Sequence, residues 1–216
     1  MAKAASSSAP LLLVCGDDDF SVKQRAKALF EQWSAELGGM DHEIVEASAN
    51  NAGEALNRLG RLREALNTLP FFGGAKAVWF RDCTFLGDDR TSASAAVTEE
   101  LGRLADELKA FRWENVRLLI SGAKPDKRRT FYKTVEKLGT VEAFNALSAD
   151  DKDWAGKAES EALRLFRAAG KDIADNALAE LVTRVGPNLR SLANEVEKLV
   201  LYLGEREEVS LPDVQT

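Results

Sequence analysis

Residues 11–20 read LLLVCGDDDF, and this stretch decides the fold. Residues 11–15 are an apolar run of strand length that ends at Gly16. A segment with the period of an amphipathic helix follows and stops at Gly38-Gly39. The apolar side chains of that segment are Val22, Ala26, Leu29, Phe30, Trp33 and Leu37. The sequence therefore predicts a strand, a tight turn and a helix in that order.

Strands and helices continue to alternate as far as about residue 145. Further strands are expected at residues 42–47, 77–80, 116–120 and 141–144, and further helices at residues 52–66, 95–110 and 127–138. This alternation predicts a parallel sheet with helices on both faces.

The pattern changes after residue 147. No strand is expected there, and three helical stretches cover residues 150–169, 175–185 and 188–203. We therefore expect an α/β domain at 10–146 and a small all-α three-helix lid domain at 147–209. Residues 1–9 are expected to be a disordered leader, and residues 210–216 (SLPDVQT) to begin a further helix.

Composition excludes several classes of protein. No apolar run approaches the roughly 20 residues of a membrane span, so no membrane contact is expected. The net charge of −6 disfavours general nucleic-acid binding. Cys15 and Cys83 lack metal or redox spacing and are expected to be buried or half-buried structural thiols in a reducing cytoplasm. His42 stands in a polar segment and is expected at the surface.

An α/β domain followed by a helical lid is the layout of an AAA+ ATPase, but the nucleotide loop is absent from the sequence. The first turn should read GxxxxGK[ST], whose amides and lysine hold phosphates. Here Gly16 is followed by three aspartates, which would repel a triphosphate, and one of them is expected to cap the helix. The third strand is followed by Arg81 and Asp82, with one carboxylate where two are needed. We expect a degenerate nucleotide site without cofactor, metal or catalysis.

An apolar pair stands between the second helix and the third strand, in Leu69-Pro70-Phe71-Phe72-Gly73-Gly74. Pro70 ends the helix and the glycines turn the chain. The two phenylalanines either fold back onto the core of their own domain or project as anchors for a partner protein.

Residues 124–133 carry five basic side chains: Lys124, Lys127, Arg128, Arg129 and Lys133. They are candidates for contact with DNA phosphates. The alternative is a solvated helix start, with Asp126 as its cap.

Several segments, in this order and spacing, resemble the δ subunits of bacterial DNA polymerase III. They are LLLVCGDDDF, TLPFFGGAKAVWFRD, LLISGAKPDKRRTFYKTVEKLG, RVGPNLRSLANEVEKLVLYLG and the closing VSLPDV. The resemblance covers nearly the whole chain from about residue 10.

The resemblance implies a clamp-loader subunit that hydrolyses no ATP. Such a subunit binds the ring-shaped β sliding clamp and holds one interface open, for loading on primed DNA. The family's clamp-binding element falls here on Leu69, Pro70, Phe71 and Phe72. The family also carries a third, helical collar domain that assembles the loader, and the chain is expected to stop where this domain would begin. An ATP-hydrolysing loader subunit and a nucleic-acid-binding module using residues 124–133 stay open as alternatives.

Overall fold

The structure is a computed structural model that describes residues 9–70 and 74–215. The expected leader, apart from Ala9, and the pair Phe71-Phe72 lie outside the described residues. The chain divides into two compact units, and the boundary along the sequence falls between Phe144 and Asn145; each unit is described by itself.

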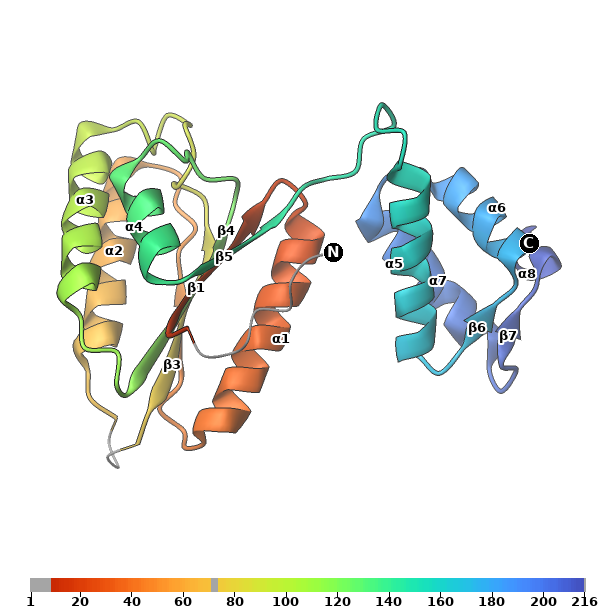
Figure 1. Cartoon of the computed structure of the whole chain (residues 1–216), viewed down its shortest axis with the longest axis horizontal. Helices are drawn as coiled ribbons and strands as arrows, with labels where there is room; N and C mark the ends of the chain where they lie inside the picture. The colour runs from red at the N-terminus through yellow and green to blue at the C-terminus, as the bar shows by residue number, and fades with distance from the viewer. Residues whose placement is uncertain (1–8, 71–73, 216) are drawn as a thin grey trace. The chain divides into compact units, whose positions relative to one another are not determined.

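The first unit is built on a five-stranded sheet in which every pairing is parallel (Figure 1). The strand order is β2-β3-β4-β1-β5. The strands are β1 (Leu11–Gly16), β2 (Glu43–Glu46), β3 (Lys76–Cys83), β4 (Val116–Gly122) and β5 (Thr140–Phe144). The parallel sheet predicted from the sequence is confirmed.

Helices cover both faces of this sheet, also as predicted (Figure 1). Alternate residues of β1 point to opposite faces: Leu12 and Val14 pack in one cluster with Trp33 of α1, whereas Leu13 packs in the other with α2, α3 and α4. These helices are α1 (Asp19–Leu37), α2 (Ala52–Asn67), α3 (Ala95–Ala110) and α4 (Thr130–Leu138).

The second unit contains the three expected helices around a core of its own. These are α5 (Trp154–Ala168), α6 (Asp175–Val185) and α7 (Leu189–Leu203). A short α8 (Leu211–Gln215) occupies the segment expected to begin a further domain, and Asp213 within it pairs with Arg206 at 2.9 Å.

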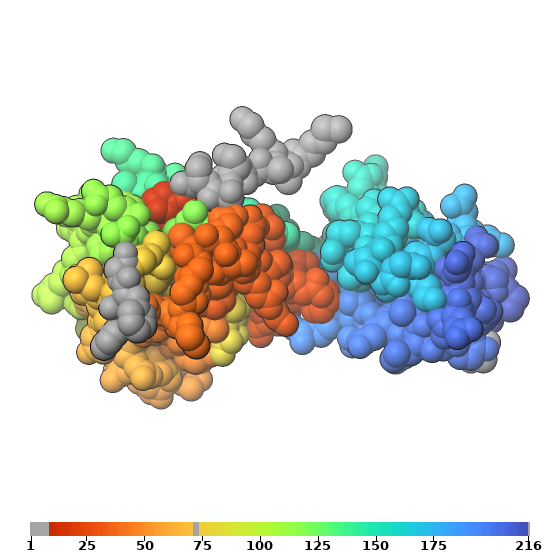
Figure 2. All heavy atoms as spheres, turned by 90° about the horizontal axis from the view of Figure 1, so that it is seen from below, coloured from red at the N-terminus to blue at the C-terminus, as the bar shows by residue number. Residues whose placement is uncertain are grey.

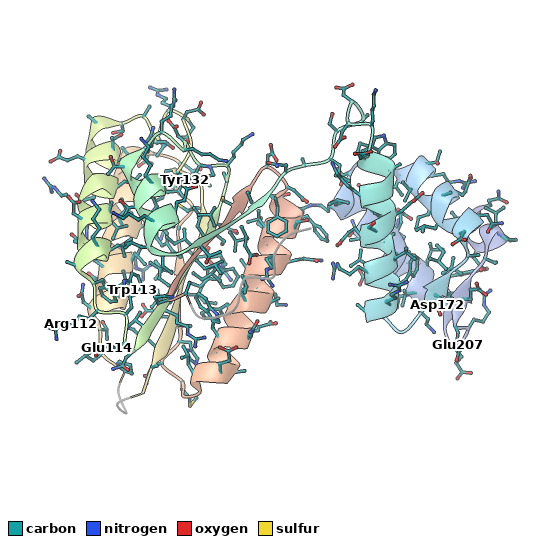
Figure 3. The ribbon with its side chains drawn as sticks, in the orientation of Figure 1. Arg112, Trp113, Glu114, Tyr132, Asp172 and Glu207 are labelled. Atoms are coloured by element: carbon teal, nitrogen blue, oxygen red, sulfur yellow. The ribbon has the colours of Figure 1, made fainter. Side chains whose placement is uncertain are left out.

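Two short strands in the second unit differ from the sequence-based expectation. β6 (Asp172–Ile173) and β7 (Glu208–Val209) pair in parallel, and the Asp172 N–H donates to the Glu207 carbonyl at 2.8 Å (Figure 3). Two residues are too few to produce a recognisable strand pattern. Among the described residues, no helix has both the length and the apolar character to span a bilayer.

Candidate functional site

In the first turn of the α/β unit, backbone N–H groups of the kind that bind phosphate in a phosphate loop donate hydrogen bonds within the protein. The carboxylate of Asp18 accepts the Ser21 N–H at 3.2 Å, which confirms the expected helix cap. The Asp18 N–H donates to the Phe144 carbonyl of β5 at 3.3 Å. Both amides are therefore bonded within the protein instead of facing an open anion site.

Gly16 is required for this close contact between β1 and β5. Its φ is +151°, and a Cβ atom there would lie 1.8 Å from the carbonyl oxygen of Phe144. The glycine at this turn thus serves strand packing.

A cleft of about 480 Å³ lies beyond the carboxyl ends of β1, β3 and β4, where an α/β protein binds its ligand. Two lysines line it, and each is near carboxylates: Lys23 is 3.8 Å from Asp82 and 3.8 Å from Asp19, and Lys124 is 3.6 Å from Asp17. Asp88 and Asp89 also line the cleft. Carboxylates outnumber the lysines there, so the surface repels a triphosphate.

The end of β3 is irregular where an ATPase would place its paired acids. Asp82 has a φ of +57°, the one positive value for a non-glycine residue within the described part of the chain. Its N–H donates to Ser121 Oγ at 3.2 Å, and the register between β3 and β4 shifts beside it. The bulge turns the single carboxylate at this strand end toward Lys23 of α1.

The two cysteines are buried, as predicted. Burial raises the pKa of the Cys15 thiol to about 11 and that of the Cys83 thiol to about 12. Both therefore stay as unreactive thiols at neutral pH.

At the other end of the sheet, where the strands begin, the connection of residues 68–75 leads from α2 to β3. We call this connection the docking loop. Thr68 closes α2, since its N–H and its hydroxyl both donate to the Glu64 carbonyl, at 2.9 and 2.7 Å. The next residue, Leu69, is 84% exposed, and Pro70 is half-buried. Of the predicted docking residues, these two are described, and both face a groove.

That groove has a volume of about 670 Å³ and runs between the carboxyl ends of α2 and α3. Its floor and rim combine apolar and charged groups. Arg63 donates to Glu107 at 2.6 Å and also to Glu100, which joins the two helices. Arg112 and Glu114 line the groove from the α3–β4 connection (Figure 3).

Figure 2 looks onto this edge of the sheet from below and shows the carboxyl end of α1 beside the segments that flank the docking loop. The α1–β2 connection carries Met40, which is 97% exposed. His42, expected at the surface, is half-buried instead, because its Nδ1 accepts the Ala77 N–H at 3.1 Å.

The basic residues at 124–133 do not form one free patch. Arg129 is mostly buried and donates to the Ser92 carbonyl at 2.5 Å. Arg128 donates to both oxygens of Asp126, at 2.9 and 3.0 Å. With Lys124 near Asp17, the exposed side chains without a partner in these pairings are Lys127 and Lys133.

The expected start of the fourth helix, at residue 127, is wrong by three residues. Asp126 accepts the Arg128 N–H at 3.0 Å and so closes a turn, and α4 begins at Thr130. The hydrogen bond from the Arg128 side chain lowers the pKa of Asp126 to about 2.

One residue near the docking loop escaped sequence-based reasoning. Lys76, the first residue of β3, is 2% exposed. A lysine after two glycines is typical of a solvated strand end, and the group that receives its Nζ hydrogen bond, the Ala65 carbonyl, is a backbone atom eleven residues earlier. No local signal in the sequence marks such a bond.

The family model described as DNA polymerase III, delta subunit, matches residues 12–145. The fold is similar to the Bacillus subtilis DNA clamp loader delta protein (YqeN), with a TM-score of 0.59 and 18% identity over 95% of this chain and 56% of that one. A chain of the E. coli MS115-1 HORMA:CdnC:Trip13 complex is similar with a TM-score of 0.55 and 12% identity, over 97% and 73% of the two chains.

No curated protein sequence matches the chain. The chain spans 56% of the length of the Bacillus subtilis protein, and the identities are low enough that these structures show the fold alone. That fold is the AAA+-like α/β unit with a helical second unit predicted from the sequence. Because the family model covers more than half of the residues, the chain belongs to the DNA polymerase III delta subunit family.

Proposed function

We propose that this protein is a non-ATPase clamp-loader subunit that binds the β sliding clamp through the docking loop and helps to open it. The assigned contact residues are Leu69, Pro70, Phe71 and Phe72. The observation that carries the proposal is Leu69, a large apolar side chain left 84% exposed just after the end of α2, in a chain of the delta family. Exposed apolar side chains at one place are typical of a protein interface.

Clamp opening requires only that the loop bind the open form of the ring more tightly than the closed form. Aromatic anchors that become fully buried in a partner contribute about 2 kcal/mol or more each. The acidic cleft at the other edge supports a role without ATP hydrolysis, since its lysines are near aspartates of the same chain. In this proposal the other loader subunits supply the nucleotide chemistry, and the complex works in the cytoplasm.

The test is retention of the cognate clamp by immobilised wild-type protein and by Phe71→Ala/Phe72→Ala. We expect the double variant to lose most of the retained clamp. The matched control is Leu201→Ala/Tyr202→Ala, because these two apolar side chains are exposed on α7 of the second unit. Retention of the clamp by the loop variant at the wild-type level would refute the assigned site.

DNA contact is a separate part of the proposal. We assign contact with the phosphates of primed DNA in the assembled loader to Lys124, Lys127, Arg128, Arg129 and Lys133. Lys127 and Lys133 are the main contributors, because both are exposed, whereas the exposed Lys124 and Arg128 lie beside Asp17 and Asp126. Lys127→Glu/Lys133→Glu should weaken salt-dependent DNA binding of the loader and leave clamp retention unchanged. Lys27→Glu/Lys109→Glu makes the same change of charge at two exposed lysines of α1 and α3 outside this set, and it should leave DNA binding unchanged.

A further inference from the structure

A buried cation stands at the end of the docking loop. Lys76 is 2% exposed, although it is the first residue of its strand and follows Ala75, which is half-buried, and Gly74, which is exposed. Burial of an ammonium group is unfavourable unless the group gains strong hydrogen bonds, and an apolar side chain of similar length would fill the space without this cost. The ammonium group of Lys76 therefore needs hydrogen-bond partners inside the protein.

The Lys76 Nζ donates to the carbonyl of Ala65. Ala65 lies in the last turn of α2, where carbonyl groups lack partners within the helix and where a positive charge is favoured. α2 enters the docking loop and β3 leaves it. The side chain of Lys76 thus bonds the two ends of the loop to each other.

The backbone at this position is bonded to both neighbouring connections as well. The Lys76 N–H donates to the Asn115 carbonyl at 2.9 Å, in the α3–β4 connection beside the labelled Arg112, Trp113 and Glu114 (Figure 3). The next N–H, that of Ala77, donates to His42 Nδ1 in the α1–β2 connection. The end of the docking loop is therefore fixed at a point where three connections meet.

Charges around the ammonium group act in opposite directions. Burial lowers the pKa of Lys76, and the negative charges of Glu43 and Asp41 raise it to a smaller extent. These carboxylates come from β2 and from the segment before it, so the cation also faces the α1–β2 side of the edge.

We propose that Lys76 is a positioning residue for clamp binding: its buried ammonium group holds the end of α2 against the start of β3, so that the docking loop presents Leu69 and Pro70 outward. This inference rests on the proposed function. A loop whose ends are already fixed loses less conformational entropy when it binds, and the gain appears as affinity.

Two readouts test the proposal in the full chain. The first is the dissociation constant for the cognate clamp, and the second is hydrogen exchange of the peptide that spans residues 66–76, which needs no partner. Lys76→Met should weaken clamp binding about tenfold, or about 1.4 kcal/mol, and speed exchange in this peptide. Lys76→Arg, which keeps a cation and donors, should restore most of both properties.

Two controls separate positioning from general destabilisation. Arg25→Met removes a cation that bonds Glu142, in α1 and β5, and should change neither readout. In the Phe71→Ala/Phe72→Ala background, Lys76→Met should cause a smaller loss of affinity than in the wild-type protein, because both changes act through the same loop. Wild-type affinity in Lys76→Met would overturn the proposal whatever its exchange, as would wild-type exchange in this peptide or an equal effect of Arg25→Met.

The two proposals fail in different ways. If Phe71→Ala/Phe72→Ala binds the clamp like wild type, the clamp site is wrong, and the positioning of the loop for that site falls with it. If that variant loses binding while Lys76→Met keeps it, the clamp site stands and the role of Lys76 is refuted.

Discussion

Replacement of Gly16 by alanine tests the contact that closes the first turn. The new Cβ atom would lie 1.8 Å from the Phe144 carbonyl oxygen, whereas a carbon and a carbonyl oxygen normally approach to about 3.3 Å. The end of β1 or β5 would therefore have to move by about 1.5 Å. Such a shift separates the Asp18 N–H from the Phe144 carbonyl, which are 3.3 Å apart in the native turn.

The cost follows from three contributions. Loss of the hydrogen bond contributes about 1 kcal/mol, the unfavourable φ of +151° about 1–3 kcal/mol, and overpacking about 1–3 kcal/mol. One shift of the strand relieves part of each, so the contributions are not additive. We expect the free energy of unfolding of the first unit to fall by about 3 kcal/mol.

Urea unfolding followed by tryptophan fluorescence measures this loss, because Trp33 and Trp79 are buried in the first unit. Gly60→Ala is the matched control: its Cβ would meet no atom within 4 Å on α2. Alanine there should stabilise the helix by up to about 1 kcal/mol. An unfolding midpoint for Gly16→Ala at or above that of wild type would refute the reasoning.

Three further predictions concern single groups. Asp18→Ala should lower the free energy of unfolding by about 1 kcal/mol in urea, whereas Asp18→Asn keeps the capping acceptor; equal midpoints for all three proteins would count against the cap. Burial raises the pKa values of Cys15 and Cys83 from 9.0 to about 11 and about 12. The stabilising contribution of the two protonated thiols should therefore be fully present below pH 9 and be lost as the pH rises from there through their folded-state pKa values. Urea titrations at pH 8 and pH 10 should show this loss in the wild-type protein and not in the Cys15→Ala/Cys83→Ala variant. Hydrogen bonding to Arg206 lowers the pKa of Asp213 to about 2. The stabilising contribution of this carboxylate should therefore be present above about pH 4 and disappear toward pH 2. In an acid titration followed by circular dichroism, Asp213→Asn should lose less helical signal between these pH values than the wild-type protein, and identical curves would contradict this.

Strands buried on both faces were predictable because each reads as a continuous apolar run. β1 and β4 match their expected ranges within two residues at each end, and both lie in the middle of the sheet. The degenerate nucleotide turn was predictable too, since a phosphate loop needs particular residues at fixed spacing and Asp17, Asp18 and Asp19 stand there instead.

The features that escaped prediction depend on contacts between distant parts of the chain. The buried Lys76 bonds a carbonyl on another element, and the half-buried His42 accepts the N–H of Ala77. Asp126 is a suitable helix cap by residue type, but the guanidinium of Arg128 engages its carboxylate in a preceding turn. Residue type and spacing describe what a group is able to bond, and tertiary structure selects the partner.

The hydrogen bond from the Asp18 N–H to the Phe144 carbonyl has a consequence for how the protein could switch between states. A protein switch needs a ligand that binds and dissociates. In a nucleotide-binding fold this ligand is the phosphate chain at the first turn. Here the Asp18 N–H instead donates to the Phe144 carbonyl of the neighbouring strand β5. In the proposed function, this turn therefore offers no nucleotide-driven switch, and the other loader subunits would have to drive any change of state of the protein.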